Sequence, residues 1–145
     1  MPFSVGQVLG ASALNAATLN STTATTYTPS VTGQGSATFT TLTGWYYTLG
    51  TGSGCLVFVS IYFACSGGTG ASNVTITTPT NPDRTTRQVL PGVRETAGRS
   101  EGVLVAFTGG SGNVWDRMVH GGADITGANL SGSTIHVYTG WYRQA

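Results

Sequence analysis

Residues Thr43 to Ser66, TGWYYTLGTGSGCLVFVSIYFACS, decide the fold. They predict two strands joined by a glycine-rich turn, and the second strand, Cys55 to Cys65, is apolar at odd and even positions alike. A strand with one solvated face alternates apolar and polar residues, because successive side chains point to opposite faces. We therefore expect this strand to be central, with a second sheet on one face and further protein, such as another subunit, on the other.

The rest of the chain after Thr22 predicts short strands separated by turns. Glycine is abundant, at 22 of 145 residues, and 39% of the residues are hydrophobic. This pattern predicts an all-β protein, an antiparallel, jelly-roll-like β-sandwich of about eight or nine strands. The predicted strands are Tyr27–Thr32, Ser36–Leu42, Trp45–Leu49, Cys55–Cys65, Val74–Thr77, Arg84–Leu90, Val103–Thr108, Asn113–Val119 and Thr134–Arg143.

Two segments carry more specific expectations. The charged stretch from Val93 to Gly102 is expected to form an exposed loop or an irregular hairpin. In the last strand we expect Ile135, Val137 and Trp141 to alternate with His136, Tyr138 and Tyr142, the apolar set pointing inward.

The first 21 residues are expected to form a docking arm, separate from the β-sandwich domain of residues 22–145. Ala11–Asn20 predicts a short helix, which Ser12 can cap. Ten residues are too few for a stable isolated helix, so the arm must dock on its own sandwich or on another protein. The residues that we expect to make this contact are Val5, Val8, Leu9, Leu14 and Leu19.

Charge is scarce and unevenly distributed. Charged residues make up 8% of the chain, against about 25% in typical domains, and none precedes Asp83. The formal net charge of +1 argues against electrostatic capture of nucleic acid or of an anionic membrane. The uncharged first half is either a neutral, threonine-rich β surface or a region packed within a larger assembly.

The cysteines and the N-terminal sequence suggest a cytoplasmic origin. Cys55 and Cys65 lie ten residues apart on one predicted strand, about 33 Å, so they should not form a disulfide with each other. Residues 1–20 lack the basic region and apolar run of a signal peptide, and no segment approaches the ~20 apolar residues of a membrane span. We expect a soluble protein with reduced thiols.

Candidate catalytic groups are few. Gly98–Gly102 (GRSEG) matches the nucleophile-elbow pattern at Ser100, and Asp124 and His136 follow in hydrolase order. That elbow needs a strand before it and a helix after it, whereas the flanks here predict a charged loop and a strand. His120 and His136 have no metal-site spacing and are interpreted as structural or surface residues. We therefore expect no catalytic residue, metal or cofactor, and no enzymatic activity.

Aromatic residues are the stronger indication of a binding surface. Neighbours in a strand point to opposite faces, so within Trp45–Tyr47 and within Trp141–Tyr142 at least one ring faces outward or into a partner. Burial on both faces is the alternative. The candidate ligand or interface aromatics are Trp45, Tyr47, Trp115, Trp141 and Tyr142, and the candidate subunit-interface residues are Phe58 and Tyr62.

The chain resembles β-sandwich virion proteins of tailed bacteriophages. The resemblance rests on GQVLGASALN at residues 6–15, YTP at 27–29, GWYY at 44–47, VTITTP at 74–79 and GWYR at 140–143. Such proteins include head decoration proteins and minor tail or tail-fibre proteins, and many are trimeric. Tail-fibre members are commonly attached to a longer shaft that this sequence does not show, which favours a capsid decoration protein.

The resemblance implies a structural role in a virion that is assembled in the host bacterial cytoplasm. The expected partners are further copies of the chain, as a homotrimer, and other virion proteins such as the major capsid or tail proteins. The alternative is a tail-fibre or minor tail domain that binds a receptor or carbohydrate, such as a host-surface glycan, through its aromatic residues.

Overall fold

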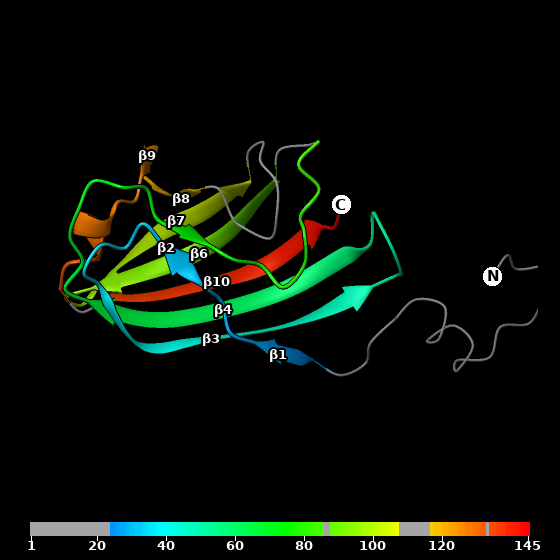
Figure 1. Ribbon diagram of the computed structural model, residues 1–145, viewed down its shortest axis with the longest axis horizontal. Helices are drawn as coiled ribbons and strands as arrows, with labels where there is room; N and C mark the ends of the chain where they lie inside the picture. The colour runs from blue at the N-terminus through cyan, green and yellow to red at the C-terminus, as the bar shows by residue number, and fades with distance from the viewer. Residues whose placement is uncertain (1–23, 86–87, 108–116, 133) are drawn as a thin grey trace, which may run out of the picture.

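The computed structural model describes residues 24–85, 88–107, 117–132 and 134–145. Its strands form two antiparallel sheets of unequal size (Figure 1), in agreement with the predicted all-β sandwich. The large sheet has eight strands in the order β1-β3-β4-β10-β6-β7-β8-β9, and the small sheet pairs β2 with β5. The strands are β1 Thr25–Tyr27, β2 Val31–Thr32, β3 Thr38–Leu49, β4 Leu56–Ser66, β5 Thr75–Ile76, β6 Gln88–Thr96, β7 Arg99–Phe107, β8 Arg117–His120, β9 Ala123–Asp124 and β10 Thr134–Arg143.

Helical structure is limited to one short element in the part of the chain that the structure describes. This element, η1, is a 3-10 helix at Gly127–Leu130. None of the helical structure described is long and apolar enough to cross a membrane. The predicted docking arm, with its helix at 11–20, and the predicted aromatic Trp115 lie outside the described residues.

The β3–β4 hairpin confirms the interpretation of Thr43–Ser66. Leu49 pairs with Leu56 next to the turn, and the pairing continues to Thr38 and Ser66, with an irregularity between Phe39 and Thr41. The sequence analysis divided β3 into two strands at Gly44, and this division is wrong. A Cβ atom at Gly44 would lie 2.4 Å from Cε1 of Tyr27, so glycine is needed there for close packing and does not break the strand.

Pro29 separates two strands that were predicted as one. β1 pairs with β3 at the edge of the large sheet, whereas β2 pairs with β5 in the small sheet. Proline has no N–H to donate to a strand ladder, so the chain can leave one sheet at this point and enter the other.

The charged segment Val93–Gly102 is a regular hairpin and not the loop that was expected. β6 and β7 pair without interruption from Gln88 with Phe107 to Thr96 with Arg99. The turn residues Ala97 and Gly98 both have positive φ angles, 49° and 78°, as a two-residue type I′ turn requires. The charges did not indicate a loop because Arg94 and Glu101 pair with each other across the two strands.

The β6–β7 turn gives a prediction about stability. Ala97 is the one non-glycine residue with positive φ in the described chain, and this conformation costs an alanine about 1 kcal/mol. Ala97→Gly should therefore raise the free energy of unfolding by up to about 1 kcal/mol in urea titration. Gly98→Ala is the matched control and should lower it, although a Cβ at Gly98 meets no atom within 4 Å. Equal stability of the two variants would contradict the strained turn.

The core lies between the large sheet and the small sheet with its loops. Figure 1 shows the small sheet crossing in front of the long strands. The face of the large sheet that turns toward it, called the inner face here, carries the fully buried side chains of β4, β6, β7 and β10. The core members from these strands are Val57, Val59, Ile61, Phe63, Cys65, Leu90, Val103, Val105, Phe107, Tyr138 and Tyr142. The other members, from the small sheet, from β8 and from the connecting segments, are Val31, Cys55, Val74, Ile76, Met118, Ile125 and Leu130.

The inner face of β10 is opposite to the one predicted. His136, Tyr138 and Tyr142 are at most 1% exposed, whereas Val137 is 37% and Trp141 42% exposed. Two of the buried polar groups find partners inside the core: His136 Nδ1 lies 3.0 Å from the Tyr138 hydroxyl, and the Tyr142 hydroxyl lies 2.7 Å from Oγ1 of Thr80. Because hydrogen-bonded polar groups can be buried, aromatic residues with polar tips form this part of the core.

The two cysteines occupy opposite ends of the central strand, as predicted. Cys55 precedes β4, Cys65 is near its end, and both side chains are buried without forming a disulfide with each other.

Candidate functional site

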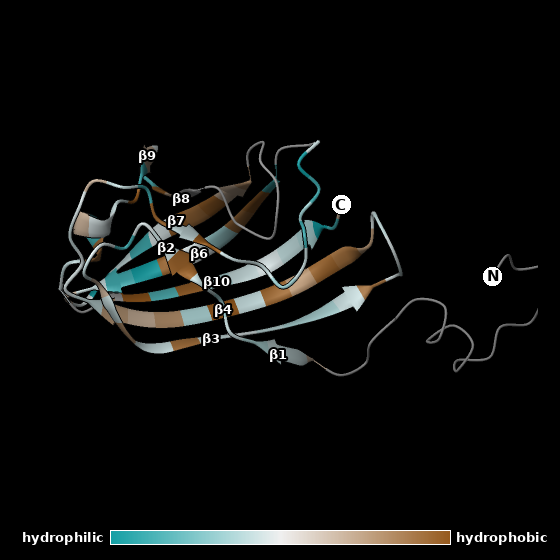
Figure 2. Cartoon of the chain, viewed as in Figure 1, coloured by the Kyte–Doolittle hydropathy of each residue, from teal (hydrophilic) through white to brown (hydrophobic). Residues whose placement is uncertain are grey.

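The face of the large sheet that points away from the small sheet is the candidate functional site, and we call it the outer face. Six large hydrophobic side chains are exposed in the described chain, and the strand register places all six on this face. Four adjacent strands contribute them: Trp45 from β3, Leu56 from β4, Val137 and Trp141 from β10, and Val89 and Val93 from β6. Figure 2 shows that β4 is hydrophobic along much of its length.

Four aromatic side chains cluster on the outer face between its middle, at Ser60, and the β3–β4 turn. We call Trp45, Tyr47, Phe58 and Trp141 the aromatic cluster. Tyr47 stacks on Phe58 at a centroid distance of 5.1 Å, and Phe58 meets Trp141 edge-on, also at 5.1 Å. Trp45 stacks on Tyr47 at 6.1 Å. Tyr47 and Phe58 are half-buried, and their rings have apolar neighbours because they contact each other and the two tryptophans.

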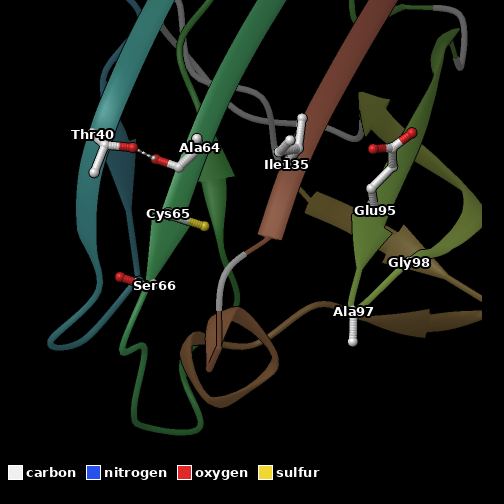
Figure 3. Close-up of a pocket in the computed structure, with 8 residues that line it drawn as sticks. All are labelled: Thr40, Ala64, Cys65, Ser66, Glu95, Ala97, Gly98 and Ile135. Atoms are coloured by element: carbon white, nitrogen blue, oxygen red, sulfur yellow. Dashed lines mark hydrogen bonds between the residues drawn. The ribbon is translucent and has the colours of Figure 1, made fainter.

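The opposite end of the outer face is hollow. A depression of about 370 Å³ lies across the successive strands β3, β4, β10 and β6 and the β6–β7 turn (Figure 3). The residues that line it are Thr40, Ala64, Cys65, Ser66, Ile135, Glu95, Ala97 and Gly98. We call this the end hollow. It is lined mainly by small side chains, and Thr40 Oγ1 lies 3.5 Å from the carbonyl oxygen of Ala64.

The middle of the outer face is uncharged. Ser60 and Thr139 pair across β4 and β10, and their hydroxyl oxygens lie 3.1 Å apart. On the described outer positions of β3, β4, β10 and β6, charge occurs at the two ends only. Arg143 lies beside the aromatic cluster, and Glu95 lies at the end hollow. A contiguous apolar area of this kind, with charge at its margins, is typical of an interaction surface.

The structure brings together most of the predicted surface aromatics. Trp45, Tyr47 and Trp141 lie in one cluster with Phe58, and Tyr62 lies on the same face between Thr43 and Val137. The prediction of an accessible Tyr142 is wrong, because this side chain is 1% exposed and belongs to the core. Burial also raises the pKa of Tyr142 to about 12.

The elbow-like motif at Ser100 does not have elbow geometry. Ser100 lies within β7, opposite Glu95, and its hydroxyl lies 3.4 Å from the Glu95 carboxylate. The motif is therefore part of an antiparallel hairpin, whereas an elbow joins a strand to a helix. His136 is fully buried and stacks on Phe63 at 4.5 Å. In the described chain there is no group of three or more His, Cys, Asp or Glu side chains that could hold a metal ion.

A polar cluster on the inner face of the β6–β7 hairpin was not predicted from the sequence. Arg94 donates to Glu101 at 2.5 Å, and Nε2 of His120 lies 3.4 Å from the same carboxylate. The hydrogen bond from Arg94 lowers the pKa of Glu101 below its ordinary value. These residues meet because strand register places them opposite one another, and sequence spacing gave no signal of it.

Comparison of the chain with protein-family models, with curated proteins and with solved structures finds no match.

Proposed function

We propose that the protein is a non-enzymatic structural protein of a bacteriophage particle that works by assembly. The observation that carries the proposal is the outer face, where all six exposed large hydrophobic residues of the described chain gather on four adjacent strands. Burial of such a surface is the main favourable term in most protein association, because it removes apolar area from water.

The virion role is supported by the sequence resemblance to phage head decoration and tail proteins. In this proposal the outer face binds further copies of the chain, and the resemblance implies a homotrimer. The arm at residues 1–21 anchors the assembly on the capsid, through Val5, Val8, Leu9, Leu14 and Leu19. The protein then reaches the virion during assembly in the host bacterial cytoplasm.

The alternative is a tail-fibre or minor tail domain that binds a carbohydrate. The aromatic cluster favours this alternative, because Trp45 and Trp141 are 38% and 42% exposed and solvent-exposed aromatic rings can stack on the apolar face of a sugar. A host-surface glycan would then be the ligand, and the same outer face would be the binding site.

The two functions predict different binding partners, and substitutions in different parts of the chain should abolish the binding. If the decoration role is correct, the full-length protein should be oligomeric by light scattering and should sediment with empty capsids of tailed bacteriophages. Leu9→Asp with Leu14→Asp should abolish capsid binding and leave the oligomer intact, because the outer face is unchanged. A protein that is monomeric and does not bind capsids would contradict the proposal.

Glycan-array binding that is lost in Trp45→Ala and Trp141→Ala would support the alternative.

A further inference from the structure

We propose that the outer face binds a second copy of the same chain in antiparallel orientation. In this pair Leu56 of each copy enters the end hollow of the other, and Arg143 of each copy faces Glu95 of the other. The inference rests on the self-association in the proposed function, and it specifies the contact and its symmetry.

The two ends of the outer face have complementary shapes. At one end of β4 the side chain of Leu56 is 46% exposed beside Arg143, and at the other end Ala64 lines a depression of about 370 Å³ (Figure 3). A two-fold interface brings the same patch of both copies together, so a residue that contacts another must also be contacted by it. A face with an exposed apolar side chain at one end and a hollow at the other satisfies this condition when the two copies run in opposite directions.

The charges also favour the antiparallel arrangement. Ile135 is the β10 neighbour of Glu95, and Arg143 lies eight residues further along β10, about 26 Å away. Copies that run in the same direction would place Arg143 against Arg143 and Glu95 against Glu95. Copies that run in opposite directions place opposite charges together at both ends, and like charges across an interface are strongly unfavourable.

The centre of the face suits a two-fold axis. Thr139 lies midway between Ile135 and Arg143 on β10, so the axis would pass close to Thr139 and its partner Ser60. Trp45 is the β3 partner of Ser60, so the exposed Trp45 rings of the two copies would meet beside this axis. The hydroxyl groups of Ser60 and Thr139 are paired with each other at 3.1 Å, which reduces the cost of burying them.

The area is sufficient for a specific pair. Four strands about 4.8 Å apart and about 26 Å long span about 500 Å² in each copy. Two copies therefore bury about 1,000 Å² or more, which reaches the approximate lower limit of about 1,000 Å² for specific interfaces. Because a two-fold contact uses the same patch of both copies, it closes with two copies, in place of the three that the resemblance implies.

Charge reversal in separate chains tests the pair directly. Arg143→Glu alone and Glu95→Arg alone each create like-charge contacts at both ends, so each variant should associate at least tenfold more weakly than the unaltered protein in light scattering and sedimentation. An equimolar mixture should recover a two-copy species, because both end contacts in the mixed pair have opposite charges. Within one chain the two residues lie at opposite ends of the sheet, so recovery in the mixture cannot come from an intrachain ion pair.

A second variant avoids the risk that Arg143→Glu disturbs the fold, since Arg143 also lies 3.6 Å from Asp83. Ala64→Trp fills the end hollow without a change of charge and should weaken association to a similar extent. Ala128→Glu, an exposed position in η1 outside the large sheet, is the control and should leave association unchanged. Circular dichroism establishes that each variant is folded.

Three results would overturn the inference. They are a monomeric unaltered protein, association that survives both Glu95→Arg and Ala64→Trp, and a mass of three copies. A three-copy mass with capsid binding would leave the proposed function standing, whereas a two-copy protein that ignores capsids would contradict the function and not the pair.

Discussion

Lowering the pH from 6.5 to 4.5 should reduce the free energy of unfolding by about 2 kcal/mol, because over this range His136 takes up a proton in the unfolded state and stays neutral in the folded state. Its side chain is 0% exposed, stacked on Phe63 and bonded through Nδ1 to Tyr138. Burial, with the positive charge of Arg94 nearby, lowers the pKa of His136 from 6.5 to about 3. Nε2 of His136 has no hydrogen-bond partner among the described residues, so nothing compensates for charging the ring.

The direction follows from proton binding in the two states. An unfolded chain binds a proton at His136 near pH 6.5, whereas the folded chain binds it only near pH 3. The stability is therefore fully present above pH 6.5 and falls as the pH drops toward 3, by about 1.4 kcal/mol per unit once the unfolded state is protonated. Asp83 and Glu101, whose pKa values are also lowered, add to the loss mainly below pH 4.5.

The measurement is urea unfolding at pH 6.5, 5.5 and 4.5. The double variant His136→Phe with Tyr138→Phe is the control, since it removes both members of a buried hydrogen bond and keeps two aromatic rings in place. Its stability should change by less than about 0.5 kcal/mol over the same range. An unaltered protein with the same stability at pH 6.5 and 4.5 would show that His136 is accessible to protons.

The central hairpin could be predicted because its signal is local. Apolar residues on both faces of Cys55–Cys65 indicated a central strand, and β4 pairs with β3 on one side and β10 on the other. The same pattern predicted protein on both faces, and the structure provides it on one: Val59 and Ile61 are 0% exposed, whereas Leu56 is 46% exposed. Cover for the second face is what the proposed assembly would supply.

The orientation of β10 could not be obtained from its residues alone. Alternation was predicted correctly, but hydropathy assigned the wrong set to the core. His136, Tyr138 and Tyr142 lie inside with their polar atoms partnered: His136 bonds to Tyr138 within the strand, and Tyr142 bonds to Thr80, which is distant in sequence. Val137 and Trp141 are more apolar and face outward, where the neighbouring strands add further apolar residues.

The sequence therefore predicted which residue types form the candidate site, but not where in the sheet they lie. The aromatic pairs required that at least one ring of each face outward, and Trp45 and Trp141 do so. Their gathering into one cluster follows from the order β3-β4-β10, which brings residues 45 and 141 to the two sides of Phe58. Short-range patterns do not contain strand order, so the end hollow and the charges at the two ends were also unpredictable.

Val59→Asp should abolish folding, whereas Tyr62→Asp should leave a folded protein that no longer associates. Val59 is 0% exposed on the inner face of β4 and pairs with Tyr46 and Gly140. An aspartate there would lose about 2 kcal/mol of apolar burial and place an unpaired carboxylate in the core, at several kcal/mol more. Since small domains are stable by about 5–15 kcal/mol, this loss removes most or all of the stability.

Tyr62 lies three residues further along the same strand but on the outer face, half-buried between Thr43 and Val137. In a single chain an aspartate there remains in contact with water, so circular dichroism should show a native sheet with little loss of stability. In an assembly the same carboxylate would be buried in the apolar centre of the interface, which is costly without a partner charge, so light scattering should report monomers. If Tyr62→Asp is instead insoluble or unfolded, both faces of β4 belong to the core of one subunit, and the outer face is not a docking surface. The two substituted positions are three residues apart on one strand and lie on opposite faces of the sheet, so their comparison separates the effect on folding from the effect on assembly.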